Sequence, residues 1–167
     1  MNVQIARMER FHLREVQRVD RLVYNRPWSL AMFRQELEKR ESRHYLVAAI
    51  DDTHVGHAGL MLIAGEGHVS TVVVDPAWQR RGIGALLLLA LHRYAIARGV
   101  EAMTLEVRVS NAPAIEMYRQ FGYAPAGVRK NYYSDEGEDG LVMWAHDIQL
   151  QEHQARLAAI EAEVSSR

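Results

Sequence analysis

The residues best suited to chemistry lie in the middle of the chain, where the apolar run Val72–Val74 is followed by a turn, two arginines and two glycines. The glycines, Gly82 and Gly84, lead into a long apolar stretch with the composition of a helix. A strand that enters a helix through such a turn leaves unpaired backbone N–H groups at the helix N-terminus, and these groups favour an anion. Arg80 and Arg81 add positive charge there. The stretch predicts a phosphate-binding turn, although an ordinary strand-to-helix turn with solvated arginines fits the glycine spacing equally well.

Two common phosphate-binding motifs do not fit this turn. A Walker loop requires Lys followed by Ser or Thr after its last glycine, and neither follows Gly84. A dinucleotide-binding turn requires a third glycine three residues after the second, where this chain has Leu87. Both are therefore disfavoured, and the identity of the anion must come from other residues.

Two polar side chains on apolar elements could perform proton transfer. Glu106 lies in an alternating apolar stretch, where partial burial would raise the pKa of its carboxyl and let it accept a proton near neutral pH. Tyr118 lies about two turns into the helix that follows Asn111, where its phenol could protonate a leaving group. From spacing alone, structural roles are favoured for both, Glu106 as an outward-facing strand residue and Tyr118 as part of the core.

The histidines give weaker signals, and the chain has no cysteine. His68 opens a strand candidate, and a structural or solvated role is favoured over a catalytic one for such a lone histidine. His54 and His57 have an H-x-x-H spacing, but a separation of three on a strand puts them on opposite faces. The lack of cysteine excludes disulfides, thiolate catalysis and cysteine-based zinc sites. We therefore expect no metal site.

The elements that must position these residues follow from hydrophobic periodicity and turn signals. The first half predicts a strand over 3–7, two helices separated by Pro27, and an antiparallel meander of strands over 44–50, 54–63 and 68–74. The second half predicts a helix over 82–98 that ends at Gly99, a strand over 103–109, a short helix that ends at Gly122, and strands over 123–129 and 141–148 joined by a polar loop. The predicted fold class is α/β (α+β), with a mixed central sheet of about seven strands, a β-meander, flanking helices and parallel crossovers in the second half.

Composition limits the classes of partner. With 167 residues, 20 basic and 21 acidic side chains, the chain fits a soluble globular protein without a strong net charge, which argues against nucleic acid or a membrane as partner. We expect a main domain over 1–148 and a C-terminal helical extension over 149–167. The apolar stripe of this extension favours a helix docked on the same domain over a dimer contact. The N-terminus has no apolar leader-like stretch, so a cytoplasmic location is expected.

The motifs resemble those of one enzyme superfamily. The segment Gln79-Arg80-Arg81-Gly82-Ile83-Gly84 resembles the acyl-CoA-binding loop of the GNAT superfamily of N-acetyltransferases. The segment 105–118, followed by Phe121-Gly122-Tyr123, looks like a later motif of that superfamily. Within it, Arg129-Lys130-Asn131-Tyr132-Tyr133 and the acidic loop after it are similar to the bacterial ribosomal-protein-alanine N-acetyltransferases. The resemblance extends over about residues 3–148.

The resemblance implies a role for each candidate residue. Glu106 would be the general base and Tyr118 the general acid, and acetyl-CoA would be the acetyl donor, with no metal required. The residues implied in cofactor binding are Val72, Val73 and Val74 at the acetyl and pantetheine parts, Arg80, Arg81, Gly82, Ile83, Gly84 and Ala85 around the pyrophosphate, and Asn111. Trp28, Tyr132 and Tyr133 would line the acceptor entrance, because paired aromatic side chains form a narrow slot that admits a chain end.

The predicted function is an acetyl-CoA-dependent transfer of acetyl to a protein N-terminal α-amine, with the N-terminal alanine of a ribosomal protein as the acceptor that the resemblance suggests. Transfer would be direct within a ternary complex, since no cysteine offers a covalent relay. Two alternatives remain open: a small-molecule amine or lysine acetyltransferase of the same fold, and a non-catalytic acyl-CoA-binding module. The acidic run over 135–139 would either attract a basic acceptor or form a solvated hairpin tip, and the second is favoured.

Overall fold

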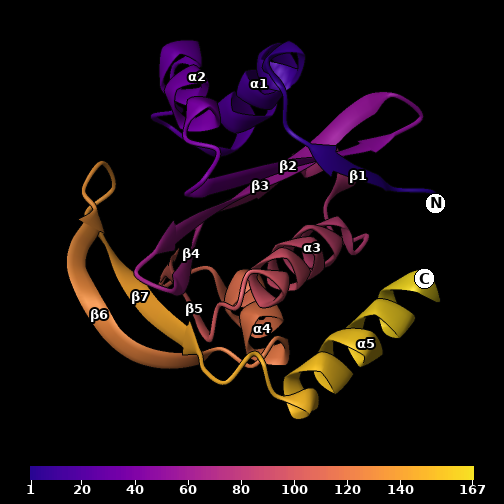
Figure 1. Cartoon of the computed structure of the whole chain (residues 1–167). Coiled ribbons are helices and arrows are strands. Elements are labelled where there is room, and N and C mark those ends of the chain that lie inside the picture. The colour runs from indigo at the N-terminus through magenta and orange to yellow at the C-terminus, as the bar shows by residue number, and fades with distance from the viewer.

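The chain is built around one mixed seven-stranded sheet, seen in a computed structural model that describes all 167 residues (Figure 1). The strands are β1 (Gln4–Arg7), β2 (Arg43–Ile50), β3 (Thr53–Ile63), β4 (Glu66–Val74), β5 (Ala102–Arg108), β6 (Ala124–Tyr133) and β7 (Glu138–Ala145), in the order β1-β2-β3-β4-β5-β7-β6. The helices are α1 (Leu13–Val23), α2 (Leu30–Glu38), α3 (Ile83–Ala97), α4 (Ala112–Gln120) and α5 (Gln151–Ser165), with short 3-10 helices η1 (Arg10–His12) and η2 (Pro76–Trp78). The predicted fold class is confirmed.

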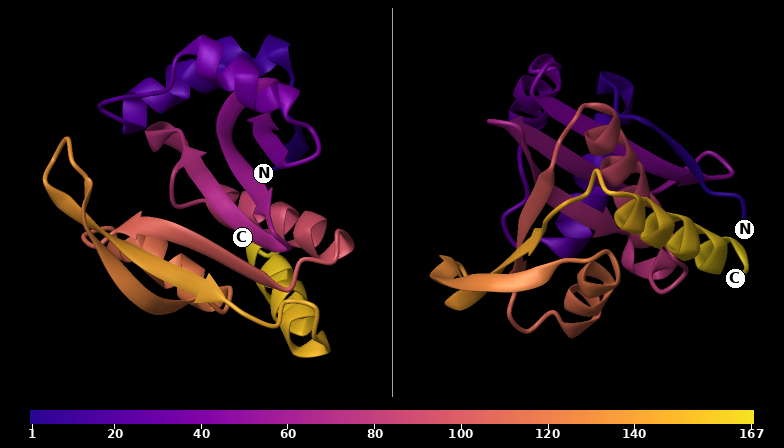
Figure 2. Two further views of the ribbon diagram at one scale, coloured as in Figure 1. Left: turned by 60° about the vertical axis from the view of Figure 1, so that its left-hand side comes forward. Right: turned by 60° about the horizontal axis from the view of Figure 1, so that its bottom comes forward.

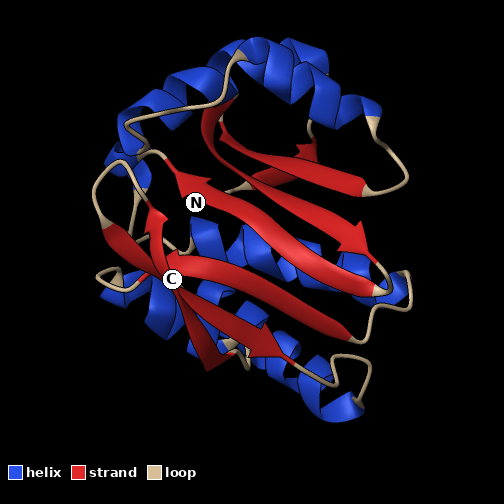
Figure 3. Cartoon of the chain, turned by 90° about the vertical axis from the view of Figure 1, so that its left-hand side faces the viewer, coloured by secondary structure: helices blue, strands red, loops and turns tan.

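Helices cover both faces of the sheet (Figures 1 and 3). The helices α1 and α2 pack on one face over a cluster of six buried residues that includes Phe33 and Val47. The helices α3, α4 and α5 lie on the other face, where a cluster of 25 buried residues forms the main core. None of the helices combines the length and the apolar composition that crossing a lipid bilayer requires.

The helix α3 is the most apolar of the five α-helices and is enclosed on two sides. It packs on the sheet through residues such as Leu87 and Leu91, which are fully buried, and α5 lies along its other side (Figure 1). Its N-cap is Gly82, with φ of +83°, and the chain leaves it through Gly99, with φ of +76°. Both glycines adopt the left-handed conformation that disfavours a side chain, as predicted for Gly99.

The helix α5 packs along the whole length of α3. Near its start, the Gln149 side-chain amide donates to the carbonyls of Ile96 and Val100, at 3.0 and 2.7 Å, at the end of α3. Near its end, Val164 packs against Gly82, so closely that a Cβ on the glycine would lie 2.8 Å from Val164 Cγ1. Residues 149–167 therefore share the core of the preceding chain, and Leu157 and Ile160 of the predicted apolar stripe are buried in it.

A chain of buried hydrogen bonds fixes the middle of α5. Arg156 can only donate, so its contact with His153 Nδ1 at 2.9 Å makes that nitrogen the acceptor. His153 Nε2 then donates to His92 Nδ1 at 2.9 Å, and His92 Nε2 donates to the Tyr123 hydroxyl at 2.9 Å. Burial lowers the pKa of His92 to about 3, and burial also lowers the pKa of His153, so both rings are neutral at pH 7.

The final hairpin is longer than predicted. The sequence indicates strands over 123–129 and 141–148 with a polar loop between them, whereas β6 continues to Tyr133 and β7 runs from Glu138 to Ala145, which is three residues short of the predicted end. Side-chain contacts cause the difference: Asp139 accepts from the Asn131 backbone N–H at 2.8 Å and pairs with Lys130 at 3.1 Å. These contacts join residues across the hairpin, which hydrophobic periodicity does not detect.

The buried histidine chain predicts how α5 contributes to stability. Replacing His153 by Ala leaves the buried Nδ1 of His92 without its donor, and we expect the free energy of unfolding to fall by about 1–3 kcal/mol. Urea denaturation followed by circular dichroism measures this change. Replacement of the exposed Gln151 on the same helix by Ala is the control and should change stability by less than about 0.5 kcal/mol. Equal stability of the His153 variant and the wild type would contradict the assignment.

Candidate active site

A cleft opens where the sheet splits between β4 and β5. These parallel strands pair only from Glu66 to His68 on β4 with Ala102 to Thr104 on β5, and beyond this point they diverge (Figure 2, left). The resulting cleft has a volume of about 590 Å³. Seven predicted site residues border it: Trp28, Val72, Glu106, Asn111, Tyr118, Tyr132 and Tyr133.

The strand β5 directs alternate side chains to its two faces. Met103, Leu105 and Val107 are buried in the main core, which turns Glu106 and Arg108 toward the cleft. The Glu106 side chain is only 9% exposed, and both of its oxygens are engaged. His68 Nε2 of β4 lies 2.6 Å from Oε2, and Arg129 Nε of β6 lies 3.2 Å from Oε1.

These contacts reverse the expected titration of Glu106. The hydrogen bond from His68 lowers the pKa of Glu106, and together with the positive charge of Arg129 it outweighs the burial that would raise it. The expectation of a raised pKa is therefore wrong, because partners from β4 and β6 stabilise the ionised form. Glu106 is a carboxylate at neutral pH.

Tyr118 borders the same cleft from α4. Its side chain is buried, and this burial, followed by the proximity of Tyr24 and Tyr133, raises its pKa, so that the phenol keeps its proton. Its ring packs edge-on against Tyr123, with centroids 5.8 Å apart. The structure thus provides a proton donor and an ionised carboxylate in one cleft. Asn111 caps α4, because its Oδ1 accepts from the Ala114 N–H at 3.3 Å, as expected.

The predicted phosphate-binding turn lies at the end of β4, where α3 starts. The N–H groups of residues 82–85 donate to no protein acceptor, as expected for the first turn of a helix. Arg80 and Arg81 form no ion pair with an acidic side chain, and Arg81 stacks over the Trp78 ring at 4.9 Å. Arg80 has φ of +67°, a conformation that a residue other than glycine adopts at an energetic cost. The turn therefore provides unpaired amides and unneutralised cations at one place.

The backbone of β4 offers a second set of free groups. Val72, Val73 and Val74 pair with Ala58, His57 and Gly56 of β3 on one edge. On the other edge no strand pairs with them, because the ladder with β5 ends at His68, and of their groups there only the Val74 carbonyl is engaged, by the Gln79 side-chain amide at 3.1 Å. The free edge can therefore hydrogen-bond an extended ligand that enters between the strands.

Aromatic side chains line the two sides of the cleft entrance. Trp28 lies in the loop between α1 and α2 and packs on Phe33, with ring centroids 5.3 Å apart. Tyr132 and Tyr133 lie at the end of β6 and pack edge-on against each other at 5.1 Å. A hydrogen bond from Asn25 to Glu136 joins the loop that carries Trp28 to the β6–β7 loop, which follows Tyr133.

The acidic run is partly neutralised within the protein. Arg108 pairs with Asp135, Glu136 and Glu138, at 3.8, 3.1 and 3.6 Å. The guanidinium of Arg108 also lies over the Tyr133 ring, 4.2 Å from its centroid. The run therefore shapes the loop beside the cleft, and these three carboxylates are already paired with a cation.

The prediction that His54 and His57 face opposite sides of β3 is wrong. A bulge in the pairing of β2 with β3 puts an extra residue after His54, and this turns both rings to the same side. His54 Nε2 lies 3.1 Å from His57 Nδ1, and His57 Nε2 lies 2.7 Å from Asp20 Oδ1. No group of three or more His, Asp or Glu side chains has the arrangement of a metal site.

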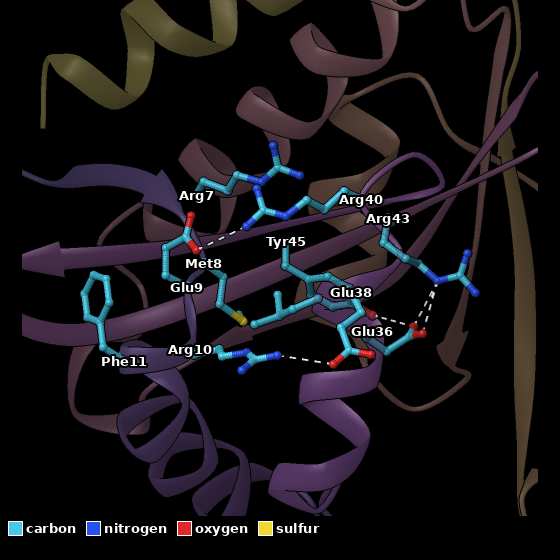
Figure 4. Close-up of a pocket in the computed structure, with 11 residues that line it drawn as sticks. Arg7, Met8, Glu9, Arg10, Phe11, Glu36, Glu38, Arg40, Arg43 and Tyr45 are labelled. Atoms are coloured by element: carbon cyan, nitrogen blue, oxygen red, sulfur yellow. Dashed lines mark hydrogen bonds and ion pairs between the residues drawn. The ribbon is translucent and has the colours of Figure 1, made fainter.

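A second hollow of about 360 Å³ lies between β1, α2 and β2 and contains none of the predicted residues (Figure 4). Most of its charges are paired with one another, such as Arg10 with Glu38 at 3.2 Å and Arg43 with Glu36 at 3.0 Å. The Tyr45 hydroxyl also donates to Glu36, at 2.9 Å. The arrangement explains how these polar groups are satisfied, and the cleft between β4 and β5 is the candidate site.

The sequence patterns assigned no role to Arg108 or Arg129. For His68 they favoured a structural role. The strand alternation that points Glu106 into the cleft also points Arg108 there, and this signal is present in the sequence. The contact between His68 and Glu106 joins residues 38 positions apart, and only the sheet topology brings them together.

Comparisons with known proteins identify the family of the chain. The model of the acetyltransferase (GNAT) family matches residues 12–123. N-alpha-acetyltransferase RimI of Mycobacterium tuberculosis is 40% identical over 121 residues, which are 70% of this chain and 74% of that protein. The crystal structure of the Escherichia coli ribosomal-protein-S18-alanine N-acetyltransferase has a TM-score of 0.79 at 29% identity, over 87% of this chain and 94% of that chain. The PaiA N-acetyltransferase of Thermoplasma acidophilum, solved with coenzyme A, shares the fold at 18% identity and a TM-score of 0.75, over 87% of this chain and 99% of that chain.

The split sheet and the relatives of the chain identify the protein as an N-acetyltransferase, which is an enzyme of the transferase class. The chain belongs to the acetyltransferase (GNAT) family, so the resemblance of its motifs is confirmed.

The two glycines of the turn should respond differently to substitution. At Gly82 the backbone has a positive φ, and a side chain there would contact Val164. Gly82→Ala should therefore lower the free energy of unfolding by about 1–2 kcal/mol. At Gly84 a Cβ would have ordinary contacts of 3.6 Å or more, so Gly84→Ala should fold normally. It should nevertheless weaken CoA binding about tenfold, or about 1.4 kcal/mol, because the added methyl group, beside Val74 and Met117, narrows the space next to the unpaired amides.

Urea denaturation and isothermal titration calorimetry with CoA separate these effects. Gly65→Ala is the matched control, because Gly65 has φ of +80°, lies in the β3–β4 turn and leaves open space within 4 Å of the position that a Cβ would take. It should reduce stability without changing CoA affinity. Normal CoA binding by the Gly84 variant would contradict the assignment of the turn.

Proposed function

We propose that this protein acetylates the N-terminal α-amine of a protein with acetyl-CoA, and that the N-terminal alanine of a ribosomal protein is its acceptor. The observation that supports this most is the presence of Glu106, paired with His68, and the protonated Tyr118 in one cleft. The E. coli neighbour is named for the alanine of ribosomal protein S18, which supports the choice of acceptor. Such an acceptor implies a cytoplasmic enzyme.

The groups present fit acetyl-CoA. Four consecutive unpaired amides, Gly82 to Ala85, and the cations of Arg80 and Arg81 suit the pyrophosphate. The free edge of Val72–Val74 suits the amides of the pantetheine arm, and Asn111 borders the cleft near its cap position. A neighbour of the same fold was solved with coenzyme A, which supports the same ligand here. When bound, acetyl-CoA supplies an activated thioester carbonyl.

The chain's own residues would then move the protons. The α-amine must lose a proton before it attacks, and its pKa of about 7.7–8.0 makes this easier than for a lysine at about 10.4. Glu106 supplies the negative charge that draws the proton away, and the backbone N–H groups on the free edge of β4 stabilise the oxyanion. Tyr118 donates its proton to the departing sulfur. The transfer is direct, because the chain has no cysteine to carry the acetyl group.

The entrance supports a chain end as the acceptor. Trp28 on one side and Tyr132 and Tyr133 on the other form its aromatic walls. The Asn25–Glu136 hydrogen bond links the loop that carries Trp28 to the β6–β7 loop after Tyr133. An internal lysine would have to bring two flanking chain segments to this entrance, whereas an N-terminus brings one. These features favour an α-amine over a lysine side chain.

A panel of acceptors tests the proposal. The protein is incubated with acetyl-CoA and a peptide with a free N-terminal alanine, an N-terminally blocked peptide with one internal lysine, or a polyamine, and the products are identified by mass spectrometry. We expect acetylation of the α-amine alone. Modification of only the lysine or the polyamine would contradict the proposed acceptor. CoA binding without transfer to any amine would indicate a binding module.

Removal of the Tyr118 hydroxyl tests the proposed acid. Tyr118→Phe should lower kcat about 10²-fold while CoA affinity changes little, because the hydroxyl acts on the leaving sulfur. Pre-steady-state kinetics establish whether chemistry limits the rate, and calorimetry gives the CoA affinity. Tyr94→Phe is the matched control, since Tyr94 stacks on His44 away from the cleft. Unchanged turnover with chemistry rate-limiting would remove Tyr118 from the mechanism.

A further inference from the structure

Asp20 lies on the face of α1 that packs against the sheet. Val16, four residues before it, is buried in the cluster beneath α1 and α2, and Tyr24, four residues after it, borders the cleft. Residues four apart in a helix lie on the same face. The side chain of Asp20 is 7% exposed, so a carboxylate occupies a position where helical periodicity favours an apolar residue. Burying a charge costs free energy unless other groups compensate it, and the residue therefore needs an explanation.

The neighbouring strand holds one oxygen of this carboxylate. His57 of β3 is fully buried, and its Nε2 lies 2.7 Å from Asp20 Oδ1. Because a carboxylate can only accept, Nε2 is the donor. His57 Nδ1 lies 3.1 Å from His54 Nε2, so both nitrogens of the buried ring have partners within the protein. The orientation of Asp20 is therefore fixed from the side of the sheet.

The second oxygen of Asp20 is free. Oδ2 has no hydrogen-bond partner in the protein, and it is not among the buried atoms that lack one, so solvent reaches it. Asp20 borders the cleft, and its partner His57 is paired with Val73 in the ladder between β3 and β4. Val73 belongs to the free edge that suits the pantetheine arm. The free oxygen is therefore accessible at the level of the sheet where we expect the acetyl donor.

Asp20 is also the one acidic side chain of the cleft that no arginine neutralises. The acidic residues that border the cleft are Asp20 and Glu106. Glu106 pairs with Arg129, whereas Arg26 and Arg108, which border the cleft as well, form no ion pair with Asp20. Charges interact more strongly in a partly buried cleft than in water. A positively charged group that enters the cleft therefore finds an available counter-ion in Asp20.

We propose that Asp20 binds the amine of the acceptor, with Oδ2 as the counter-ion of the ammonium group. The proposal rests on the proposed function. An ammonium group offers N–H donors and a positive charge, and hydrogen bonds from such a donor to a carboxylate are among the strongest in proteins. Proton transfer stays with Glu106 and Tyr118, so Asp20 itself neither gains nor loses a proton.

The same contact suits the next stage of the reaction. When the deprotonated amine attacks the thioester carbonyl, its lone pair becomes the new N–C bond, and the nitrogen is positively charged until it loses a second proton. A carboxylate beside this nitrogen stabilises the charge as it stabilised the ammonium group. Asp20 thus contributes to the bound acceptor and to the transition state alike, and such uniform binding lowers KM without raising kcat.

Asp20→Asn tests the role of the charge, because it keeps the size of the side chain and an oxygen for His57 Nε2. With acetyl-CoA saturating and a peptide that starts with alanine as the acceptor, we expect KM to rise about tenfold and kcat to change by less than about threefold. The CoA affinity, measured by calorimetry, should stay the same. Glu15→Gln is the matched control, since it removes a charge from the exposed side of the same helix, outside the cleft. It should leave KM and kcat unchanged.

A change in the peptide identifies the group that Asp20 contacts. A peptide that begins with a propionyl group in place of alanine has a similar shape but no amino group. Calorimetry in the presence of CoA, which carries no acetyl group to transfer, gives the affinity for both peptides. The wild type should prefer the alanyl peptide, and Asp20→Asn should reduce this preference about tenfold. A purely structural role of Asp20 would weaken the binding of both peptides equally.

Two results would overturn the proposal. One is an unchanged KM and an unchanged preference between the peptides in a folded Asp20→Asn variant. The other is a fall in kcat of more than about tenfold at unchanged KM, which would place Asp20 in proton transfer. Circular dichroism establishes folding, and Asp20→Ser, with the same expected losses, takes the place of Asp20→Asn if that variant does not fold.

Failure of the proposed function is a separate result. If the wild type acetylates only lysine or a polyamine, the proposed acceptor is wrong, and KM for that amine in Asp20→Asn still tests the contact. If the wild type acetylates no amine, the calorimetric preference for the alanyl peptide tests it in the same way.

Discussion

The early divergence of β4 from β5 is the constraint on which the site depends. A continuous parallel ladder would use the backbone groups of Val69–Val74 and leave no space between the strands. Because pairing ends at His68 and Thr104, one edge of β4 stays free and a cleft opens beside it. The side chains of His68 and Glu106 meet across the point of divergence. Backbone recognition and proton transfer thus have the same structural origin.

The core must hold the two halves of the sheet together despite this opening. A single apolar cluster continues beneath both halves and includes Leu88 of α3, Leu105 of β5 and Met143 of β7. The helix α5 adds to this support, because it packs along α3 and the flanking residues Gly82 and Val100. Its His153 also donates to His92 of α3, which in turn donates to Tyr123. Val164 lies against the glycine at which the anion-binding turn enters α3. The C-terminal extension therefore stabilises the elements that carry the turn.

Charged residues around the cleft serve mainly to fix its shape. Arg108 forms ion pairs with three carboxylates and contacts the Tyr133 ring. These contacts give the β6–β7 loop a defined conformation beside the entrance. Arg129 holds the second oxygen of Glu106. In contrast, Arg80 and Arg81 have no acidic partner, so their positive charge remains available to an anion. Arg108 and Arg129 therefore fix the shape of the acceptor side of the cleft, whereas Arg80 and Arg81 remain free to bind a phosphate.

Local sequence determined most of the architecture. Periodicity and glycine positions predicted the meander, the helix over 82–98 and the seven strands, because these signals depend on neighbours within a few residues. The motif over 79–84 indicated the family, and the structural relatives agree. Tertiary structure alone decided the ionisation of Glu106, the partnership of His68, the same-side placement of His54 and His57, and the length of the last hairpin. Each of these depends on contacts between distant strands or on a bulge, and a local pattern contains no information about such contacts.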